Sequence, residues 1–348
     1  MTALIYSIIA FSAVAVLIPA ARALARAKGF VDRPGGRKKH EDEVPPVGGL
    51  VIFPVFMTVA ALAGIDAHTM WFFLGLALLL VTGALDDRHQ LPPRVKFTAQ
   101  IATALLIVIP GGATVITLGN LFGTGPVYLG WGGAVFAAVA AVLLINAINL
   151  MDGIDGLAAG IGFIILFWLA VAGGNIHVPV MMGALGGFLL YNMRRPGRAR
   201  ASVFMGDAGS LALGLSLAWF SIHLSQGLGA VIKPAAVAWL LALPIYDTCG
   251  QFARRVRQGR HPFEPDHDHF HHHFLYAGFT PGQATAIILS ISFLFGAVGI
   301  CGAAAGVPDY VLGYVWFAGL LTHIYMSMRP HRFRRLLLRL RGGTEMPQ

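Results

Sequence analysis

The sequence has few charged residues and almost no cysteine. Only 12% of its 348 residues are Asp, Glu, Lys or Arg, whereas a soluble domain carries about a quarter. The two cysteines, Cys249 and Cys301, lie in separate apolar segments, and their spacing matches no metal or redox motif. These shortages exclude an ordinary soluble domain and a cysteine-based metal or redox site, and we expect both cysteines to be packing residues.

Long apolar runs make up most of the sequence. Hydrophobic residues make up 56% of the chain, and runs of about 20 apolar residues, the length of a membrane-crossing helix, recur along it. We predict an all-α polytopic membrane protein with about eleven transmembrane helices. They are placed at 3–21, 45–63, 69–85, 94–110, 131–149, 156–172, 178–193, 208–223, 234–250, 281–304 and 308–327. The long connection at 111–130 predicts a small external β-hairpin.

The basic residues predict the orientation. With the N-terminus outside, every Lys and Arg except Lys233 falls in an inner loop or in the C-terminal tail, as the positive-inside rule requires. The C-terminus is then cytoplasmic. The net charge of +9 is thus explained by topology and anionic headgroups, and no nucleic-acid partner is expected. We predict a single integral membrane domain over 1–328 and a basic cytoplasmic tail over 329–348. The tail lies on the inner leaflet as a helix or is a disordered basic segment.

Acidic and amide side chains gather at the inner ends of the predicted helices. Ionisable residues in such places are functional candidates. Asp86 and Asp87 end the third helix, and Lys96 opens the fourth. Asp207 lies in FMGDAGS and is expected to be the N-cap of the eighth helix. Asp247 lies near the inner end of the ninth helix.

The third inner loop holds further acids but no Lys or Arg. In NAINLMDGIDGLAAG, four polar residues follow one another at i, i+3 spacing, on one face if the segment is helical: Asn146, Asn149, Asp152 and Asp155. Carboxylates that repel one another need a cation, and hard oxygen ligands select Mg²⁺, or Mn²⁺, over zinc. Mg²⁺ held by carboxylates and substrate phosphates is the usual arrangement for phosphoryl transfer.

The stretch PFEPDHDHFHHH at 262–273 is rich in histidine. It could be a zinc-sensing loop, a solvated polar loop, or a source of hydrogen-bond donors to a pyrophosphate and sugar. We favour the last, since a zinc loop leaves the hard acids elsewhere without a purpose. Asp266 and Asp268 would orient neighbouring imidazoles or bind the arginines of 254–260.

Five motifs, in this order, resemble those of the polyprenyl-phosphate N-acetylhexosamine-1-phosphate transferases. They are DRPGGRKKHEDEVPPVGGL (32–50), LDDRHQLPPRVK (85–96), NAINLMDGIDGLAAG (146–160), FMGDAGSLALG (204–214) and RRVRQGRHPFEPDHDHFHHHFLYAGFTPGQA (254–284). The last is similar to the branch that uses UDP-N-acetylglucosamine to start O-antigen, enterobacterial common antigen or teichoic-acid linkage units. The runner-up is the peptidoglycan branch, which moves phospho-MurNAc-pentapeptide. A rival of another class is a divalent-cation transporter, which would place its ionisable groups near the membrane midplane.

The resemblance implies an enzyme of the bacterial inner membrane whose active site faces the cytoplasm. It would transfer N-acetylglucosamine-1-phosphate from UDP-N-acetylglucosamine to undecaprenyl phosphate and release UMP. It also implies residue roles: Asp207 and Asn149 at the Mg²⁺ site; Asp86, Asp87 and Lys96 at the lipid phosphate; Asp152 and Asp155 at the nucleotide, with Phe204 on uracil; and His269, His271 and His272 at the pyrophosphate and amino sugar. Asn146 is a further candidate for substrate binding. The exact hexosamine, the prenyl length and the oligomeric state, a homodimer among the options, stay open.

The chemistry of the acceptor bears on the two aspartates. A phosphate monoester has a second pKa of about 6, so much of it is already dianionic at neutral pH. A strong general base is then hardly needed. The two anionic reactants must instead be aligned, and their charge must be neutralised. We expect Asp86 and Asp87 to orient the acceptor and cation, and proton abstraction by one of them is the rival hypothesis.

Overall fold

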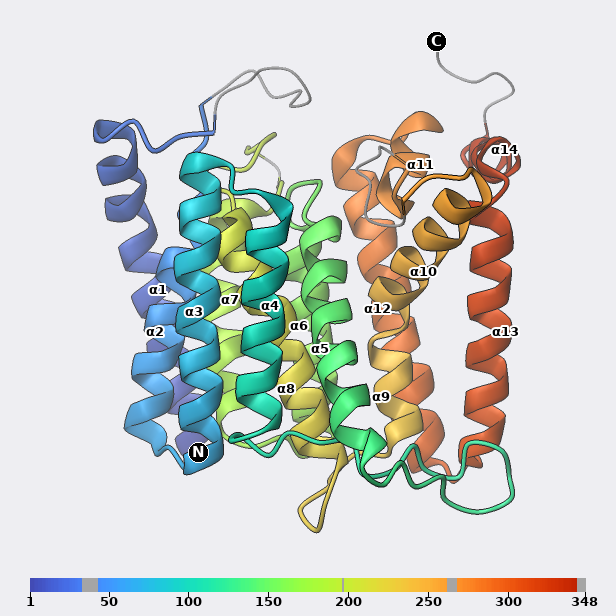
Figure 1. The fold of residues 1–348 in the computed structure, drawn as a ribbon. Coiled ribbons are helices and arrows are strands. Elements are labelled where there is room, and N and C mark those ends of the chain that lie inside the picture. Colours follow the sequence, from blue (N-terminus) through green and yellow to red (C-terminus); the bar gives the residue numbers. More distant parts are fainter. Residues whose placement is uncertain (33–42, 196, 262–267, 343–348) are drawn as a thin grey trace. The chain divides into compact units, whose positions relative to one another are not determined.

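The computed structural model describes residues 1–32, 43–195, 197–261 and 268–342. These residues form helices and no strand. The helices are α1 (Thr2–Ala27), α2 (Gly48–Ala63), α3 (Ala67–His89), α4 (Pro93–Val108), α5 (Gly132–Met151), α6 (Leu157–Val171), α7 (His177–Asn192), α8 (Gly206–Ser225), α9 (Pro234–Leu240), α10 (Ala242–Arg257), α11 (Phe270–Tyr276), α12 (Pro281–Ala304), α13 (Asp309–Ser327) and α14 (Pro330–Leu340) (Figure 1).

Each predicted span contains a helix, but one of them is broken. The range 234–250 divides at Leu241 into α9 and α10. Pro244 lies in the first turn of α10, where its missing N–H costs little, whereas it could not continue a helix from upstream. The tail contains α14, which favours the helical interpretation for Pro330–Leu340.

Apolar helices make this an α-helical membrane protein. Among the described residues, five helices are long and apolar enough to cross a bilayer: α1, α3, α5, α8 and α12. A sixth span results if α13 and α14, which meet at a bend of 102°, are counted as one. The shorter helices α2 and α6 are also apolar. The prediction of about eleven spans, and their orientation, therefore stays a prediction.

The predicted external hairpin is not confirmed as a pair of strands. Within 111–130, Thr117 and Tyr128 form an isolated antiparallel bridge. Leu118 donates to the Val127 carbonyl over 2.9 Å, and Val127 donates back to Gly119 over 2.9 Å.

The chain divides into two compact units, and the first comprises Met1–Ile116 and Leu129–Ile232. Its central helix is α8, which is buried along nearly its whole length and packs against α2, α3, α5 and α6. Gly83 allows the close approach of α3, because a Cβ there would lie 2.3 Å from the backbone nitrogen of Ala208. The C-terminal end of α3 is thereby held against the first turn of α8.

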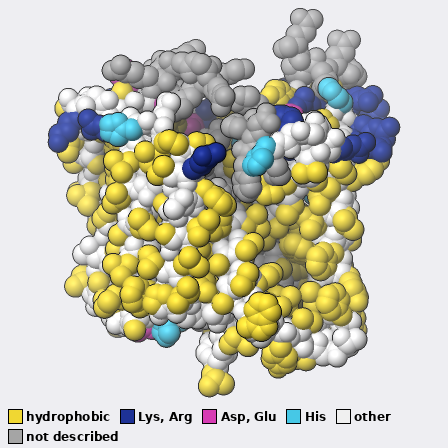
Figure 2. Space-filling view, viewed as in Figure 1, with side chains coloured by type: hydrophobic (Ala, Val, Ile, Leu, Met, Phe, Trp, Pro, Cys, Tyr) yellow, Lys and Arg dark blue, Asp and Glu magenta, His cyan; other side chains and the backbone are white. Residues whose placement is uncertain are grey.

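The second unit comprises Thr117–Tyr128 and Lys233–Gln348. In it α9 packs on α12 and α13, and α10 packs on α13. Trp239 donates to the Leu312 carbonyl over 3.1 Å, and Tyr246 donates to the Trp316 carbonyl over 2.6 Å. The short helix α11 lies on α12 and α14. In Figure 2, hydrophobic side chains cover much of the visible surface of each unit, and Lys and Arg side chains gather at one end of each unit.

Candidate active site

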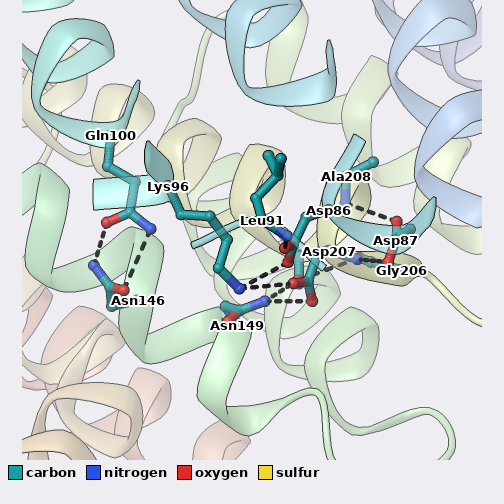
Figure 3. A network of polar contacts seen from close by, with 11 residues as sticks. Asp86, Asp87, Leu91, Lys96, Gln100, Asn146, Asn149, Gly206, Asp207 and Ala208 are labelled. Carbon is teal, nitrogen blue, oxygen red and sulfur yellow. Dashed lines mark hydrogen bonds and ion pairs between the residues drawn. The ribbon is translucent and has the colours of Figure 1, made fainter. Parts of the chain in front are cut away.

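Three helix ends meet in the first unit and bring together acids that are far apart in sequence. Figure 3 shows the ammonium of Lys96, from α4, directed at both Asp86 at the end of α3 and Asp207 at the start of α8. The Lys96 Nζ lies 2.7 Å from Asp86 Oδ2 and 3.4 Å from Asp207 Oδ2. Asp86 is 7% exposed, whereas Asp207 is 33% exposed. The other oxygen of Asp86 accepts from the Leu91 amide over 2.7 Å, which fixes the turn after α3.

Asp87, unlike its neighbour Asp86, accepts hydrogen bonds from the backbone amides of another helix. Its Oδ1 accepts from the backbone amide of Asp207 over 2.9 Å, and its Oδ2 from that of Ala208 over 3.3 Å. The first amides of a helix have no partner within the helix, so Asp87 caps α8 from another helix. The expectation that Asp207 is the N-cap is wrong: α8 begins at Gly206, after Met205, and Asp207 lies in its first turn.

Gly206 makes this junction sterically accessible. Its φ is +74°, a conformation that residues with a Cβ rarely adopt. A Cβ there would lie 2.6 Å from Asp87 Oδ2 and 2.7 Å from the Pro46 carbonyl oxygen. Glycine therefore lets the carboxylate of Asp87 reach the amides of α8.

The two asparagines of α5 face different partners. Asn149 donates to Asp207 Oδ1 over 3.0 Å and to Ser210 Oγ over 2.8 Å, so it belongs to the acid cluster. Asn146 and Gln100 exchange hydrogen bonds of 2.6 and 3.3 Å through their amide groups. Asn146, which was expected to bind substrate, thus pairs with Gln100 of α4.

Of the four polar residues expected on one helical face, only Asn146 and Asn149 lie in a helix. Helix α5 ends at Met151, and Asp152 is its C-cap. The backbone therefore leaves the helix before Asp155. Asp155 Oδ2 accepts from Arg194 Nε over 2.7 Å and from the Ala201 amide over 3.0 Å. It thereby ties the loop after α7 to the loop after α5.

The pKa of Asp152 is raised by its burial and by the carboxylates around it. Burial raises its pKa to about 7, and the carboxylates of Asp207, Asp87 and Asp155 add to this shift. With Asp86, Asp87, Asp152 and Asp207 near one another, the single ammonium of Lys96 does not balance the negative charge when all are ionised. Such a set of oxygen donors fits a hard divalent cation that substrate phosphates would help to hold. The described residues contain no cluster of three His, Cys, Asp or Glu side chains arranged to hold a metal by themselves.

Phe204 lies just before this junction, and its backbone is held from both sides. Its amide donates to the Pro45 carbonyl over 3.0 Å, and its carbonyl accepts from Gly48 over 2.9 Å. The segment before α8 is thus joined to the start of α2. The side chain is half-buried.

The expected histidines lie in the second unit, at the start of α11. His269 Nδ1 lies 3.1 Å from Asp247 Oδ2, and the Phe270 amide donates to Asp247 Oδ1 over 2.9 Å. Asp247, 2% exposed, therefore anchors α11 to α10. His272 is half-buried, and its ring centroid lies 4.1 Å from that of His271.

Two imidazoles of α11, those of His271 and His273, have lowered pKa values and are neutral at neutral pH. Burial lowers the pKa of His271 well below its usual value. Among the described residues neither of its ring nitrogens has a hydrogen-bond partner. Burial also lowers the pKa of His273 to about 4; Asp268 opposes this shift and Arg334 adds to it.

Asp268 binds arginine, but Arg334, which lies closer to it than Arg254, is outside the range 254–260 expected from the sequence. Its carboxylate pairs with Arg334, and its Oδ2 lies 3.8 Å from Arg254 Nη1. Its backbone carbonyl accepts from Gln251 over 2.6 Å and from Arg254 over 3.0 Å. Asp266 lies outside the described residues, as do parts of the motifs at 33–42 and 262–267.

Comparisons with known proteins show the family of this chain. The family model described as glycosyl transferase family 4 matches residues 69–225. An undecaprenyl-phosphate alpha-N-acetylglucosaminyl 1-phosphate transferase of Escherichia coli O157:H7 is 31% identical over 93% of this chain and 92% of its own length. This chain belongs to glycosyl transferase family 4. A Yersinia pestis relative of the same name is 32% identical over 92% of this chain and 90% of its own length. A Bacillus subtilis protein, named "Probable undecaprenyl-phosphate N-acetylglucosaminyl 1-phosphate transferase", is 33% identical over 83% and 81%.

Several polar side chains that bind the candidate site residues were not predicted from the sequence. Gln100 stands in the apolar run TAQIATALL, and a lone amide inside such a run is a signal for a paired polar group. Ser210 and Arg194 carry no comparable signal, because serine at a helix start and arginine in an inner loop are both common.

Proposed function

We propose that this protein transfers N-acetylglucosamine-1-phosphate from UDP-N-acetylglucosamine to undecaprenyl phosphate and releases UMP, as the first membrane step of a cell-envelope glycan pathway. Two observations support this. Relatives named for this reaction align with more than nine-tenths of the chain. Three of the five motifs, those at 85–96, 146–160 and 204–214, converge on the cluster around Asp207.

The cluster has the charge pattern that phosphoryl transfer between two anions requires. Lys96 can turn from its carboxylate partners toward a phosphate, because its side chain is 29% exposed. A divalent cation, Mg²⁺ or Mn²⁺, would neutralise the phosphates when bound, with Asp207 as a ligand and Asn149 beside it. Asp86 holds Lys96, and Asp87 holds the first turn of α8. The attacking oxygen comes from a phosphate that is already largely ionised, so positioning and charge neutralisation carry the step.

We assign the donor to three groups of residues. Asp152 and Asp155 would lie at the nucleotide, with Phe204 stacking on uracil and Asn146 among the substrate-binding residues. His269, His271 and His272 would contact the pyrophosphate and amino sugar. The buried ring nitrogens of His271, which lack a partner among the described residues, support a polar ligand, because a buried unsatisfied donor costs about 1–3 kcal/mol.

The membrane topology belongs to the same proposal. The single integral domain over 1–328 would cross the bacterial inner membrane about eleven times, with the N-terminus outside and the active site and basic tail in the cytoplasm. The clustering of basic residues between apolar helices supports this orientation.

Donor selection tests the proposal against its runner-up. Purified protein is incubated with undecaprenyl phosphate, Mg²⁺ and either UDP-N-acetylglucosamine, UDP-N-acetylgalactosamine or UDP-MurNAc-pentapeptide, and UMP is measured. We expect UMP with UDP-N-acetylglucosamine. UMP with the pentapeptide donor alone would identify the peptidoglycan branch, and uptake of divalent cations into vesicles without UMP release would favour the transporter.

A further inference from the structure

The C-terminal helix α14 has two faces of different chemistry. Its inner face contacts α11 through Phe333 and Arg334 and includes the buried Leu337 and Leu338. Arg341 follows directly after the helix. Its outer face is exposed and consists of Arg332, Arg335, Leu336, Arg339 and Leu340.

On the inner face, Arg334 spans the histidine helix α11 from one end to the other. It pairs with the Asp268 carboxylate before the helix begins. Its Nε lies 3.3 Å from His273 Nδ1, and its guanidinium lies 4.1 Å from the ring centroid of Tyr276 at the last residue of the helix. One side chain thus fixes the start, the middle and the end of α11.

Helix α11 needs such support. It has seven residues, and no side chain of its own N-cap satisfies its first amides. An isolated helix of this length is unstable in water. Phe333 stacks on Phe270 with centroids 5.8 Å apart, and Arg341 donates to the Ala277 carbonyl over 3.3 Å. Helix α14 therefore supplies one support of α11, and Asp247 supplies another.

The outer face has the composition of a helix that lies on a membrane surface. Helix α14 contains no acid, and among the described residues Arg332, Arg335 and Arg339 form no ion pair. Leu336 and Leu340 beside them are 42% and 74% exposed. The bend of 102° from α13 turns α14 along the surface of a bilayer that α13 would cross. Figure 2 shows basic side chains gathered at the end of this unit where α14 lies. Anionic headgroups would supply the negative charge that pairs with these arginines, and Leu336 and Leu340 would enter the headgroup–acyl boundary.

We propose that α14 is a membrane-surface brace: its outer face binds anionic phospholipid, and this binding fixes Arg334 against the histidine helix, so that use of the nucleotide-sugar donor depends on the charge of the surrounding lipid. Arg334 is a positioning residue in this account. The kinetic part rests on the proposed function, whereas the binding and ordering part does not.

The test uses the full chain in vesicles of phosphatidylcholine alone or with phosphatidylglycerol at a 3:1 ratio. Two quantities are measured: hydrogen exchange of the α11 backbone amides, and kcat and KM for UDP-N-acetylglucosamine at saturating undecaprenyl phosphate. A basic residue near an anionic surface contributes about 1 kcal/mol, a fivefold effect, so we expect α11 protection and donor kcat/KM to rise about fivefold or more with the anionic lipid. The double variant Arg332→Gln/Arg339→Gln should lose this dependence. The control Lys28→Gln/Arg195→Gln removes equal charge from other exposed positions and should keep it.

The Arg334 variants separate positioning from general stability. Loss of a charged hydrogen bond costs about tenfold or more, so Arg334→Ala should lower α11 protection and raise the donor KM by about tenfold in both vesicles, with the acceptor KM unchanged. Arg334→Lys should recover part of the donor KM because it restores the charge. Equal α11 protection of the wild type in both vesicles would overturn the brace, whether or not the protein is a transferase. A donor KM untouched by Arg334→Ala in an active enzyme would overturn the link to donor use, and α11 protection that follows lipid charge in an inactive protein would support the brace while refuting the transferase.

Discussion

Asp87 holds Asp207 in place through the backbone. Both carboxylate oxygens of Asp87, at the end of α3, accept hydrogen bonds from the amides of Asp207 and Ala208 at the start of α8. Asp86, the adjacent residue, instead holds the ammonium of Lys96. Two neighbouring aspartates therefore serve the same cluster in different ways, one by fixing a helix and one by fixing a cation.

Removing the cap should damage stability and catalysis together. Asp87→Ala is expected to lower the free energy of unfolding by about 1–2 kcal/mol, as the loss of an N-cap does. It should lower kcat by about a hundredfold, because Asp207 moves with the freed turn. Thermal unfolding in detergent and UMP release measure the two effects.

Asp66 provides the matched control for this variant. It caps the start of α3 by accepting from the Thr69 amide over 2.7 Å. Asp66→Ala should destabilise the protein by a similar amount and leave kcat nearly intact. Equal loss of kcat in both variants would show that Asp87 acts only through global stability.

A methyl group at Gly206 should have a larger effect than backbone strain alone explains. Gly206 and Gly227 have nearly the same φ, +74° and +75°, so alanine costs each about 1 kcal/mol or more in strain. A Cβ at Gly227 meets nothing within 4 Å, whereas one at Gly206 meets Asp87 and Pro46. Gly206→Ala should therefore lower both the melting temperature and kcat, and Gly227→Ala only the melting temperature. Normal turnover of Gly206→Ala would contradict the junction described above.

The pKa of Asp152 predicts that stability falls as pH rises. An unfolded aspartate releases its proton near pH 4, whereas the folded protein holds the proton of Asp152 up to about pH 7. Between these values the folded state binds more protons, so rising pH destabilises it. We expect the melting temperature to decrease from pH 5 to pH 8 in the wild type and to decrease less in Asp152→Asn. A profile that is identical in both proteins would remove Asp152 as the cause.

Alanine at the histidines tests their assigned role. His269→Ala/His271→Ala/His272→Ala should lower kcat/KM for UDP-N-acetylglucosamine by about tenfold or more, since each lost directed hydrogen bond costs roughly that much. Inhibition by UMP, which reports the nucleotide part of the site, should change little. Unchanged turnover, with zinc binding that the substitutions remove, would instead favour a zinc-sensing loop.

The sequence predicted the helices well because apolar runs of membrane length are a strong signal. It could not predict the break at Leu241, because Pro244 is compatible with either a kink or a helix start. No helix was predicted in the histidine-rich stretch 262–273, yet Phe270–Tyr276 is helical because Asp247 and Arg334 hold it from other helices.

The acids of the site were identified from the motifs, but their partners were not. Whether Asp207 caps its own helix or Asp87 does so from α3 depends on how closely α3 approaches α8, which Gly83 permits. Likewise, the turn of Asn146 toward Gln100 depends on the packing of α4 against α5. Such choices are made by tertiary contacts and leave no local pattern in the sequence.

The nucleotide that is released tests the central claim most directly. Purified wild type and Asp207→Asn are incubated with undecaprenyl phosphate, Mg²⁺ and UDP-N-acetylglucosamine labelled with ³²P in the β-phosphate, and the products are separated. Transfer of the sugar phosphate predicts that the wild type moves the label into the lipid and releases unlabelled UMP, and that Asp207→Asn does neither. Labelled UDP with an unlabelled glycolipid, or full activity of Asp207→Asn, would contradict the account.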